Sequence, residues 1–332
     1  MPTQLGDLMS WRGKPVIVTG GMGFIGSNLV RRLLAAGAEV TVIDRMLAQY
    51  GANPFNLSGL ALTELIEADI GAEAAIFEAI GKAAVIFNFA GQTSHMDSMK
   101  QPLEDLRLNQ EANLRFLELI RRVNPQARLI FSSTRQFYGP PHYLPVDEKH
   151  PIAPPDINGI HKYAAESYHM LYARVHGMRT TALRLTNVFG PRMRIRDAKQ
   201  TFLGIWVRHV IENTRFEVWG GEQKRDFTYV DDLIDAALLA AETESTIGQI
   251  YNIGGCPPMS LLELAELLIK VGGSGGFDRK EFPAERKKID IGDYVADDAA
   301  FRAATGWTPK TTLADGLKQT LEFYRGNAAH YL

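Results

Sequence analysis

The sequence predicts an α/β protein with a doubly wound parallel sheet and a smaller C-terminal α/β lobe. Three observations indicate this fold class. Short β-branched runs alternate with longer helical patterns in the first half of the 332 residues, as expected of parallel strands joined by crossover helices. A glycine-rich turn separates the first strand from the first helix. Beyond about residue 190 the alternation gives way to a basic loop and separate helical patterns, which indicates a second lobe.

The predicted elements follow one another in a regular order. Runs rich in Val, Ile and Phe predict four strands, at residues 16–19, 40–44, 84–89 and 128–133. Helical spacing of apolar residues predicts helices at 24–36, which Gly37 ends, and at about 105–122. Three further helices are expected in the second half, at about 202–212, 260–271 and 313–324. Strand–helix alternation places helices on both faces of the sheet.

Composition excludes several classes of protein. Hydrophobic residues make up 45% and charged residues 22%, which is typical of a globular chain with a sizeable core. The formal net charge of −2 lacks the basic excess of a nucleic-acid binder. The single cysteine, Cys256, excludes an internal disulfide and a multi-cysteine metal site. No apolar run is long enough to span a membrane and the start has no secretory pattern, so we expect a cytoplasmic protein.

The glycine-rich turn predicts a dinucleotide site. Gly20, Gly23 and Gly26 lie directly after a strand and at the start of a helix, with Phe24 and Ile25 between the last two. Glycine lets the backbone turn tightly and lets a pyrophosphate approach the unpaired N–H groups of the helix N-terminus. The alternative is a tight turn without a ligand. The preceding strand, the following helix and an acid at the next strand end favour a Rossmann-type site.

That acid is Asp44, which ends the second predicted strand, 18 residues after Gly26. A carboxylate there accepts hydrogen bonds from the adenosine ribose and repels a 2′-phosphate, so it favours NAD over NADP. Arg45 follows at once and is the one residue that weakens this preference. We therefore expect NAD as the cofactor, with Asp44 and Arg45 beside it.

Several blocks resemble one family, the extended short-chain dehydrogenase/reductases, and within it the nucleotide-sugar epimerases and dehydratases. The resemblance runs from about residue 14 to 325, and it is strongest to UDP-glucose 4-epimerase-like proteins. The matching blocks begin with the spacing of Gly20, Gly23 and Gly26. The others start at Ala68, Asn88, Phe131, Arg184, Arg225 and Gly306.

The resemblance implies a set of site residues. Asp69, Ile70, Ala90, Gly91 and Lys162 would line the bound NAD. The substrate would be held by four residues, namely Asn187, Arg192, Val218 and Arg225. For Arg225 the planar fork of donors suits a diphosphate, whereas the alternative is a salt bridge to a neighbouring aspartate. For Asn187 the alternative is a turn-capping amide.

The resemblance also implies domain limits and an oligomeric state. An NAD-binding Rossmann domain would cover residues 1–190, with 226–255 returning to it. A substrate-binding lobe would comprise 191–225 and 256–332. Two helices, about 105–122 and 162–176, match those that pair relatives into homodimers. The expected partners are thus a nucleotide sugar, most of all a UDP-sugar, and a second copy, with neither nucleic acid nor membrane.

One position departs from the family pattern. Relatives carry a catalytic tyrosine four residues before the lysine, whereas this chain has Asn158 before Lys162. The two positions share a helix face, so Asn158 is able to orient a hydroxyl or a water. An amide cannot ionise in the range where a phenol exchanges protons, so Asn158 is not the base.

Another residue must therefore take over the proton transfer. His95 follows the predicted strand at 84–89 near the expected site and has a suitable ordinary pKa, so it is the preferred substitute. Lys162 is a further candidate if the positive charge of the cofactor depresses its pKa. Tyr163 points elsewhere on the helix, and His161 and Tyr138 fit supporting roles better.

The residues after the predicted strand at 128–133 bear on the reaction. Thr134 matches the Ser/Thr that hydrogen-bonds the reacting hydroxyl in relatives. Sugar 4,6-dehydratases carry an Asp-Glu pair in the next two positions, whereas this chain has Arg135 and Gln136. The loss of both acids disfavours that dehydration. An Arg-Gln pair beside the substrate suits a polar or anionic sugar substituent, and the alternative is that both side chains lie on the surface.

Three hypotheses remain. The first is an NAD-dependent epimerase that inverts C4 of a UDP-hexose by transient hydride transfer to bound NAD. The second is another nucleotide-sugar oxidoreductase (a dehydrogenase, a reductase or an atypical dehydratase) with an acid/base other than tyrosine. The third is a catalytically silent NAD-binding module. The presence of Thr134, Lys162, Asn187 and Arg225 argues against the third.

Overall fold

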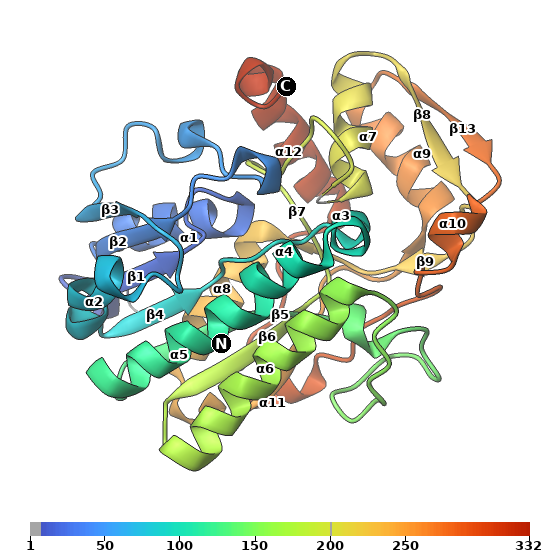
Figure 1. The fold of residues 1–332 in the computed structure, drawn as a ribbon. Coiled ribbons are helices and arrows are strands. Elements are labelled where there is room, and N and C mark those ends of the chain that lie inside the picture. Colours follow the sequence, from blue (N-terminus) through green and yellow to red (C-terminus); the bar gives the residue numbers. More distant parts are fainter. Residues whose placement is uncertain (1–7, 200) are drawn as a thin grey trace.

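A seven-stranded parallel sheet forms the centre of the computed structural model, which describes residues 8–199 and 201–332 (Figure 1). Its strands are β1 (Pro15–Thr19), β2 (Glu39–Asp44), β3 (Glu64–Glu67), β4 (Val85–Asn88), β5 (Arg128–Thr134), β6 (Thr180–Leu185) and β11 (Ile250–Ile253). They are ordered β3-β2-β1-β4-β5-β6-β11, and every neighbouring pair is parallel. The order changes direction between β1 and β4, the place at which open α/β sheets bind ligands.

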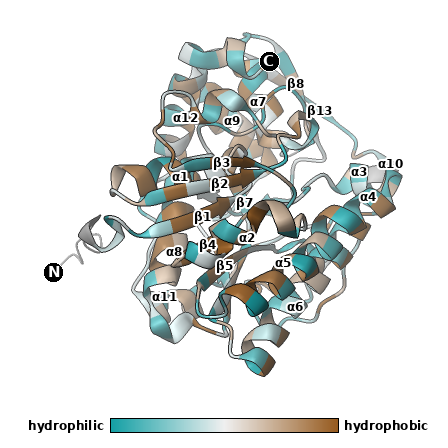
Figure 2. Ribbon diagram, turned by 60° about the vertical axis from the view of Figure 1, so that its left-hand side comes forward, coloured by the Kyte–Doolittle hydropathy of each residue, from teal (hydrophilic) through white to brown (hydrophobic). Residues whose placement is uncertain are grey.

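Helices cover both faces of the sheet, which confirms the predicted doubly wound fold (Figures 1 and 2). One face carries α1 (Phe24–Ala35), α8 (Val230–Glu242) and α11 (Ala299–Thr305), and the other carries α2 (Glu73–Lys82), α5 (Ala112–Val123) and α6 (Ile157–His176). The side chains of strand β1 show why helices pack on both faces of the sheet. Val16 and Val18 join the hydrophobic cluster on the α1 side, whereas Ile17 joins the cluster on the α2 side. Successive side chains on a strand point to opposite faces, and both faces here are apolar.

The predicted helix at 105–122 is present but irregular. It comprises α4 (Pro102–Leu106), the π-helical turn η4 (Arg107–Glu111) and α5, and a short helix, α3 (His95–Lys100), precedes it. A π turn inserts one extra residue into a helix and is often found at functional sites. Here it carries the buried Asn109.

The second lobe contains α7 (Phe202–Ile211), α9 (Leu261–Gly272) and α12 (Leu313–Asn327), as predicted, together with α10 (Ala284–Lys287). Strands β8 (Arg215–Trp219) and β13 (Gly276–Lys280) form a parallel pair. Two short ladders, β7 (Asn187–Phe189) with β10 (Phe227–Tyr229) and β9 (Lys224–Arg225) with β12 (Met259–Ser260), run along the junction with the large sheet. Short 3-10 turns complete the elements, at η1 (Leu8–Trp11), η2 (Ala48–Tyr50), η3 (Pro54–Leu57), η5 (Gln136–Tyr138), η6 (Glu244–Thr246) and η7 (Ala328–His330).

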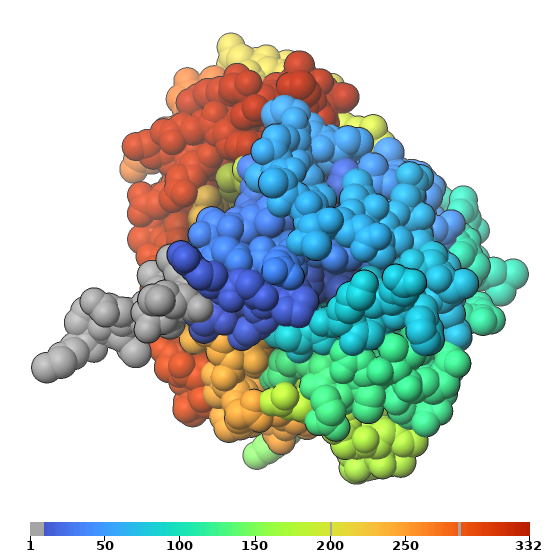
Figure 3. Space-filling model, turned by 90° about the vertical axis from the view of Figure 1, so that its left-hand side faces the viewer, coloured from blue at the N-terminus to red at the C-terminus, as the bar shows by residue number. Residues whose placement is uncertain are grey.

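Two distant segments meet beside the glycine-rich turn. The Tyr331 hydroxyl donates to Oδ1 of Asn56 at 2.6 Å, and His330 stacks on Phe55 at 3.7 Å between ring centroids. In turn, Nδ2 of Asn56 donates to the carbonyl of Met22 within the turn at 2.9 Å. Figure 3 shows C-terminal segments in red against N-terminal segments in blue.

Among the described helices, none is both long and apolar enough to cross a membrane.

A buried ion pair fastens α6 to the sheet. Arg184 on β6 donates to both carboxylate oxygens of Glu166 on α6, at 2.6 to 3.2 Å, and both side chains are almost wholly buried. Ser133 on β5 donates to the same carboxylate at 2.6 Å. Because the pair is enclosed, neither charge has water as a substitute partner.

We therefore expect Arg184→Met to lower the free energy of unfolding by about 3–5 kcal/mol, since Glu166 is left as an unpaired buried charge. Urea denaturation followed by circular dichroism measures the change. The matched control is Arg115→Met, which breaks an exposed pair with Glu111 and is expected to cost less than about 1 kcal/mol. Equal losses in the two variants would contradict the argument.

Candidate active site

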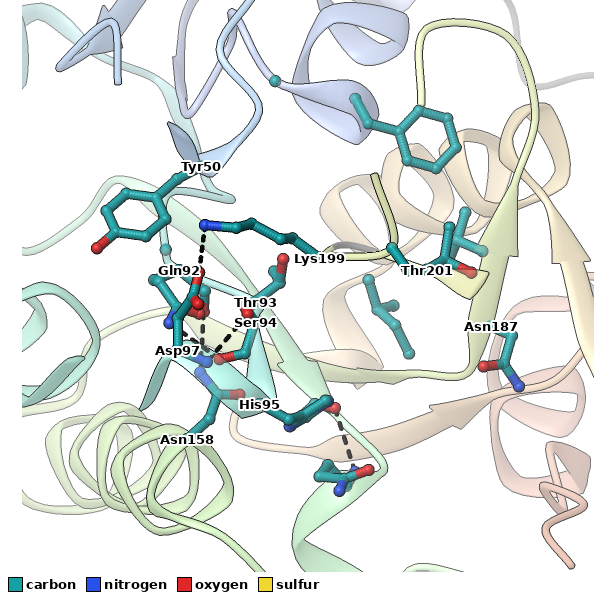
Figure 4. Close-up of a pocket in the computed structure, with 18 of the residues that line it drawn as sticks. Tyr50, Gln92, Thr93, Ser94, His95, Asp97, Asn158, Asn187, Lys199 and Thr201 are labelled. Atoms are coloured by element: carbon teal, nitrogen blue, oxygen red, sulfur yellow. Dashed lines mark hydrogen bonds and ion pairs between the residues drawn. The ribbon is translucent and has the colours of Figure 1, made fainter. Parts of the chain in front are cut away.

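A cavity of about 1010 Å³ opens at the carboxyl edge of the large sheet and continues between the sheet and the second lobe (Figure 4). This volume lies at the upper end of small-molecule sites, which span roughly 300–1,000 Å³. Strand ends β1, β2, β4 and β5 line one side, and residues of α7, β8 and β9 line the other. In Figure 4 Tyr50 and Asp97 lie on one side of the cavity, and Asn187 and Thr201 lie on the other.

The glycine-rich turn forms the floor of the cavity at its sheet end. Gly20 has a φ of +69°, in the left-handed region that favours glycine. A Cβ on Gly26 would lie 2.2 Å from the Gly20 carbonyl oxygen, so only glycine fits the contact between turn and helix. Phe24 and Ile25, in the first turn of α1, line the cavity. This cradle of bare backbone before a helix N-terminus fits a dinucleotide pyrophosphate.

The next part of the cavity fits an adenosine. Asp44, at the end of β2, accepts the N–H groups of Met22 and Met46 at 2.9 and 2.8 Å, and burial raises its pKa. Arg45 turns to Asp69, with 3.2 Å between the charged atoms. The charge of Arg45 is therefore already paired, which leaves the Asp44 carboxylate to discriminate against a 2′-phosphate. Asp69, Ile70 and Ala90 line the same cavity as the glycine turn.

Lys162 lies directly beneath Gly91. A Cβ on Gly91 would come within 2.6 Å of the lysine Nζ and 2.8 Å of Oδ1 of Asn109, so glycine makes room for the ammonium group. Burial lowers the pKa of Lys162 to about 8, although the charge of Asp105 opposes the shift. The Nζ atom forms no hydrogen bond or ion pair with any residue that the structure describes. An unpartnered ammonium at this place fits the ribose hydroxyls of a cofactor.

Asn158 lines the cavity, yet its amide is tied to the protein (Figure 4). Its Nδ2 donates to the Gln92 carbonyl at 3.0 Å and to Oδ2 of Asp105 at 3.1 Å. Asp105 is buried and also binds Nδ1 of His161 at 2.7 Å and Nδ2 of Asn109 at 3.1 Å. Asn158 therefore serves as a member of a buried hydrogen-bond network, and the sequence interpretation missed its centre, Asp105.

His95 and Asp156 form a second pair at the cavity. Nδ1 of His95 lies 2.9 Å from Oδ2 of Asp156, while 38% of the histidine side chain remains exposed. Asp156 also caps α6 by accepting the Gly159 N–H at 2.7 Å, and it accepts Nε2 of Gln136 at 2.9 Å. Burial raises the pKa of Asp156, but the hydrogen bond and charge of His95 and the two other donors lower it below its usual value. The helix-capping pattern before residue 157 was the available sequence signal for Asp156.

The predicted substrate residues Asn187 and Arg225 reach the cavity as well. Asn187 donates from Nδ2 to the Asp226 carbonyl at 3.0 Å and accepts from Nη2 of Arg135 at 2.9 Å. Arg225 pairs with Asp290 at 3.0 Å and donates to the Gly292 carbonyl. Arg225 thus forms a salt bridge, as the alternative interpretation expected, but its partner is Asp290 and not an aspartate next to it in the sequence. Thr134 lines the same cavity.

Two residues expected at the substrate site do not line the cavity. Arg192 donates to Oδ1 of Asn28 at 2.8 Å and lies 5.0 Å above the ring of Phe323, so its charge faces the packing between α1 and α12. Val218 is fully buried in the core of the second lobe, because the alternation along β8 turns it inward and Glu217 outward. Neither is retained as a substrate ligand.

The other residues considered as bases are held in contacts with the rest of the protein and do not face the cavity as free titratable groups. Tyr138 is fully buried, donates to Asn252 at 2.9 Å and accepts from Arg184. His161 is bound to Asp105, and Tyr163 packs against Phe137 at 5.3 Å between centroids, outside the cavity lining. Only His95 and Lys162 combine a titratable group with a place on the cavity wall among these candidates.

The parallel sheet, the glycine cradle and the paired Asp44 define a dinucleotide-binding protein of the Rossmann class. A family model described as the NAD dependent epimerase/dehydratase family matches residues 16–254. Among relatives, UDP-glucuronic acid decarboxylase 1 of Xenopus tropicalis is 30% identical over 327 residues, which are 96% of this chain and 73% of the relative.

Two solved structures are similar over nearly the whole chain. The UDP-glucose 4-epimerase of Thermotoga maritima, solved with UDP-glucose, is 30% identical, with a TM-score of 0.86 over 94% of this chain and 99% of the other. The UDP-glucose 4-epimerase of Thermus thermophilus, solved with NAD, is 27% identical, with a TM-score of 0.82 over the same shares.

The chain therefore belongs to the NAD-dependent epimerase/dehydratase family. It is an enzyme of the extended short-chain dehydrogenase/reductase type that uses NAD.

The environment of Asp44 predicts cofactor choice. We expect Asp44→Asn to weaken NAD binding by about 10-fold and to narrow the preference over NADP, since the charged acceptor and the repulsion of a 2′-phosphate are both lost. Isothermal titration with NAD and NADP measures both affinities. The exposed Glu222→Gln is the control for loss of one negative charge. An unchanged ratio of the two affinities in Asp44→Asn would contradict the assignment.

The depressed pKa of Lys162 predicts a pH-dependent stability difference. The shift from 10.5 to about 8 corresponds to about 3 kcal/mol against the charged form in the folded state. Between these values the unfolded chain binds more protons, so wild-type stability gains from this group as pH rises from 8 to 10.5.

Accordingly, Lys162→Met should be more stable than the wild type at pH 7 by up to about 3 kcal/mol, and the difference should shrink above pH 8. Urea unfolding at pH 7, 8.5 and 10 measures the trend. A constant difference across these pH values would show that Lys162 is not desolvated as described.

Proposed function

We propose that the protein interconverts the C4 epimers of a UDP-hexose while NAD stays bound. The observation that carries this proposal is one continuous cavity that joins the glycine cradle to Thr134 and to the pair Asn187 and Arg225. When bound, NAD supplies a hydride acceptor that takes the hydride from the sugar carbon and returns it, so that the turnover has no net oxidation. The chain's own residues hold the sugar and move the hydroxyl proton.

Substrate binding is assigned to the side of the cavity away from the glycine turn. Asn187 and Arg225 are the candidates for the diphosphate, because an amide and a guanidinium supply donors to phosphate oxygens. Arg225 is pre-positioned by its contacts with Asp290 and Gly292. Thr134, at the end of β5, offers a hydroxyl that both donates to and accepts from the reacting hydroxyl.

Proton transfer is assigned to His95. A neutral imidazole accepts the hydroxyl proton when the carbon is oxidised and gives it back when the carbon is reduced, so the proton balance closes in each turnover. Oδ2 of Asp156 lies 2.9 Å from Nδ1 of His95, which leaves Nε2 as the atom for the substrate. The amide of Asn158 is held by Gln92 and Asp105, which supports a role for a group other than residue 158.

The neighbourhood of Thr134 supports epimerisation over 4,6-dehydration. Loss of water from a keto sugar needs an acid for the departing hydroxyl. Positions 135 and 136 carry Arg135 and Gln136, and the Gln136 amide is bound to Asp156. Neither side chain donates a proton as a carboxylic acid does.

To test the function, we would incubate the NAD-loaded enzyme with UDP-glucose and UDP-galactose and with their C6-oxidised forms, UDP-glucuronate and UDP-galacturonate. We expect a product of unchanged mass and inverted C4, measured by chromatography with mass detection and by proton NMR. We also expect His95→Ala to lower kcat by about 100-fold or more. A product two hydrogens lighter or heavier, or lacking water, would overturn redox-neutral epimerisation.

Two controls separate proton transfer from damage to the fold. The exposed His176→Ala, at the far end of α6, should retain the wild-type rate. Added imidazole should restore activity to His95→Ala but not to Lys162→Ala, because only the first variant lacks the proton acceptor. Full activity in His95→Ala would remove this residue from the mechanism and leave Lys162 as the remaining base.

A further inference from the structure

The side chain of Arg135 lies in the cavity with part of its hydrogen-bonding capacity unused. Arg135 follows Thr134 directly and lines the cavity. Its Nη2 donates to Oδ1 of Asn187 at 2.9 Å, and its guanidinium carbon lies 4.9 Å from the centroid of the Tyr294 ring. Its Nη1 is buried and has no hydrogen-bond partner among the described residues.

The charge of Arg135 is also unpaired. Two carboxylates influence it from a distance, Asp226 and Asp290, but neither forms an ion pair with it in the part of the chain that the structure describes. Asp290 is paired with Arg225, and Asp226 accepts the Ala296 N–H at 3.0 Å. Burial lowers the pKa of Arg135, yet a guanidinium stays charged in proteins. The residue as a whole is half-buried, but its Nη1 atom is enclosed; an enclosed donor on a cation without a paired carboxylate is unfavourable, and an anionic ligand group removes that penalty.

The geometry selects the kind of anion. Tyr294 supports one face of the guanidinium, which fixes the plane of its donors. A fixed planar fork fits the two oxygens of a carboxylate. Asn187 and Arg225 are the candidates for the diphosphate, whereas the backbone of Arg135 adjoins Thr134, the residue assigned to the reacting hydroxyl. Because Nη2 of Arg135 contacts Asn187, the side chain runs from the residue assigned to the reacting hydroxyl to a candidate for the diphosphate, which is the stretch that the sugar ring would occupy.

We propose that Arg135 binds a carboxylate on the sugar, so that the preferred substrate is a nucleoside diphosphate hexuronate rather than a neutral hexose. The proposal rests on the proposed function only in placing a nucleotide sugar in this cavity. It narrows the substrate class of the same site, and it is independent of which residue exchanges the proton.

The experiment is a binding comparison on the NAD-loaded enzyme with three probes, UDP, UDP-glucose and UDP-glucuronate. The two sugars differ only in whether C6 is a hydroxymethyl group or a carboxylate. We expect the wild type to bind UDP-glucuronate about 10- to 100-fold more tightly than UDP-glucose, the size of a charge-assisted hydrogen-bonded contact. Isothermal titration calorimetry measures the three affinities without requiring turnover.

Variants assign the preference to Arg135. Arg135→Met should remove the preference for UDP-glucuronate and leave UDP affinity unchanged, and Arg135→Lys should retain part of it, because the charge stays but the fork is lost. The exposed Arg279→Met, which loses one positive charge outside the cavity lining, should behave as the wild type.

Two results would overturn the proposal. A wild type without preference between the two sugars excludes a carboxylate site. A loss in Arg135→Met that is equal for UDP, UDP-glucose and UDP-glucuronate assigns Arg135 to the diphosphate or to the support of Asn187. Failure of the proposed function has a different signature, since the carboxylate preference in binding would persist while no C4 epimer forms from either sugar.

Discussion

The Asp156 carboxylate joins three parts of the site at the start of α6. One oxygen accepts the Gly159 N–H and so fixes the first turn of the helix, while the other lies beside His95 from α3 and Gln136 from η5. The positions of Asn158 and Lys162 follow from where that helix begins. The buried carboxylate of Asp156 thus positions the start of α6, the His95 side chain and the segment after β5 relative to one another. The ion pair of Glu166 with Arg184 fixes the same helix further along its length.

Asn158 takes part in a hydrogen-bond network at the cavity wall. Its amide joins Asp105, Asn109 and the Gln92 carbonyl in a hydrogen-bond network, so the space next to the cofactor cradle is occupied by polar groups that bind one another. Lys162 lies beside this network as a buried ammonium that faces the ring of Phe131, 6.0 Å from its centroid, and forms no hydrogen bond or ion pair with the residues that the structure describes. The cavity therefore combines a rigid polar wall with two titratable groups at different distances from solvent, one enclosed and one partly exposed.

Residues that act through local chain geometry could be predicted from the sequence. The glycines from Gly20 to Gly26 and Asp44 belong to this kind, because the first follow a strand and the second ends a strand that the pattern of apolar residues predicts, whereas Asp69 was expected from the family resemblance alone. Arg192 and Val218 could not be placed in this way, since their directions depend on packing against α12 and on the phase of β8. Asp105 and Asp156 were missed because their partners lie 53 and 61 residues away.

The glycine turn is a local motif, yet its final support comes from far along the chain. Met22 is held by Asn56, and Asn56 accepts the hydroxyl of Tyr331, 275 residues distant. Residues from near both ends of the described chain thus hold the phosphate cradle in place, so an intact cofactor site requires the C-terminal segment to be packed against the N-terminal one.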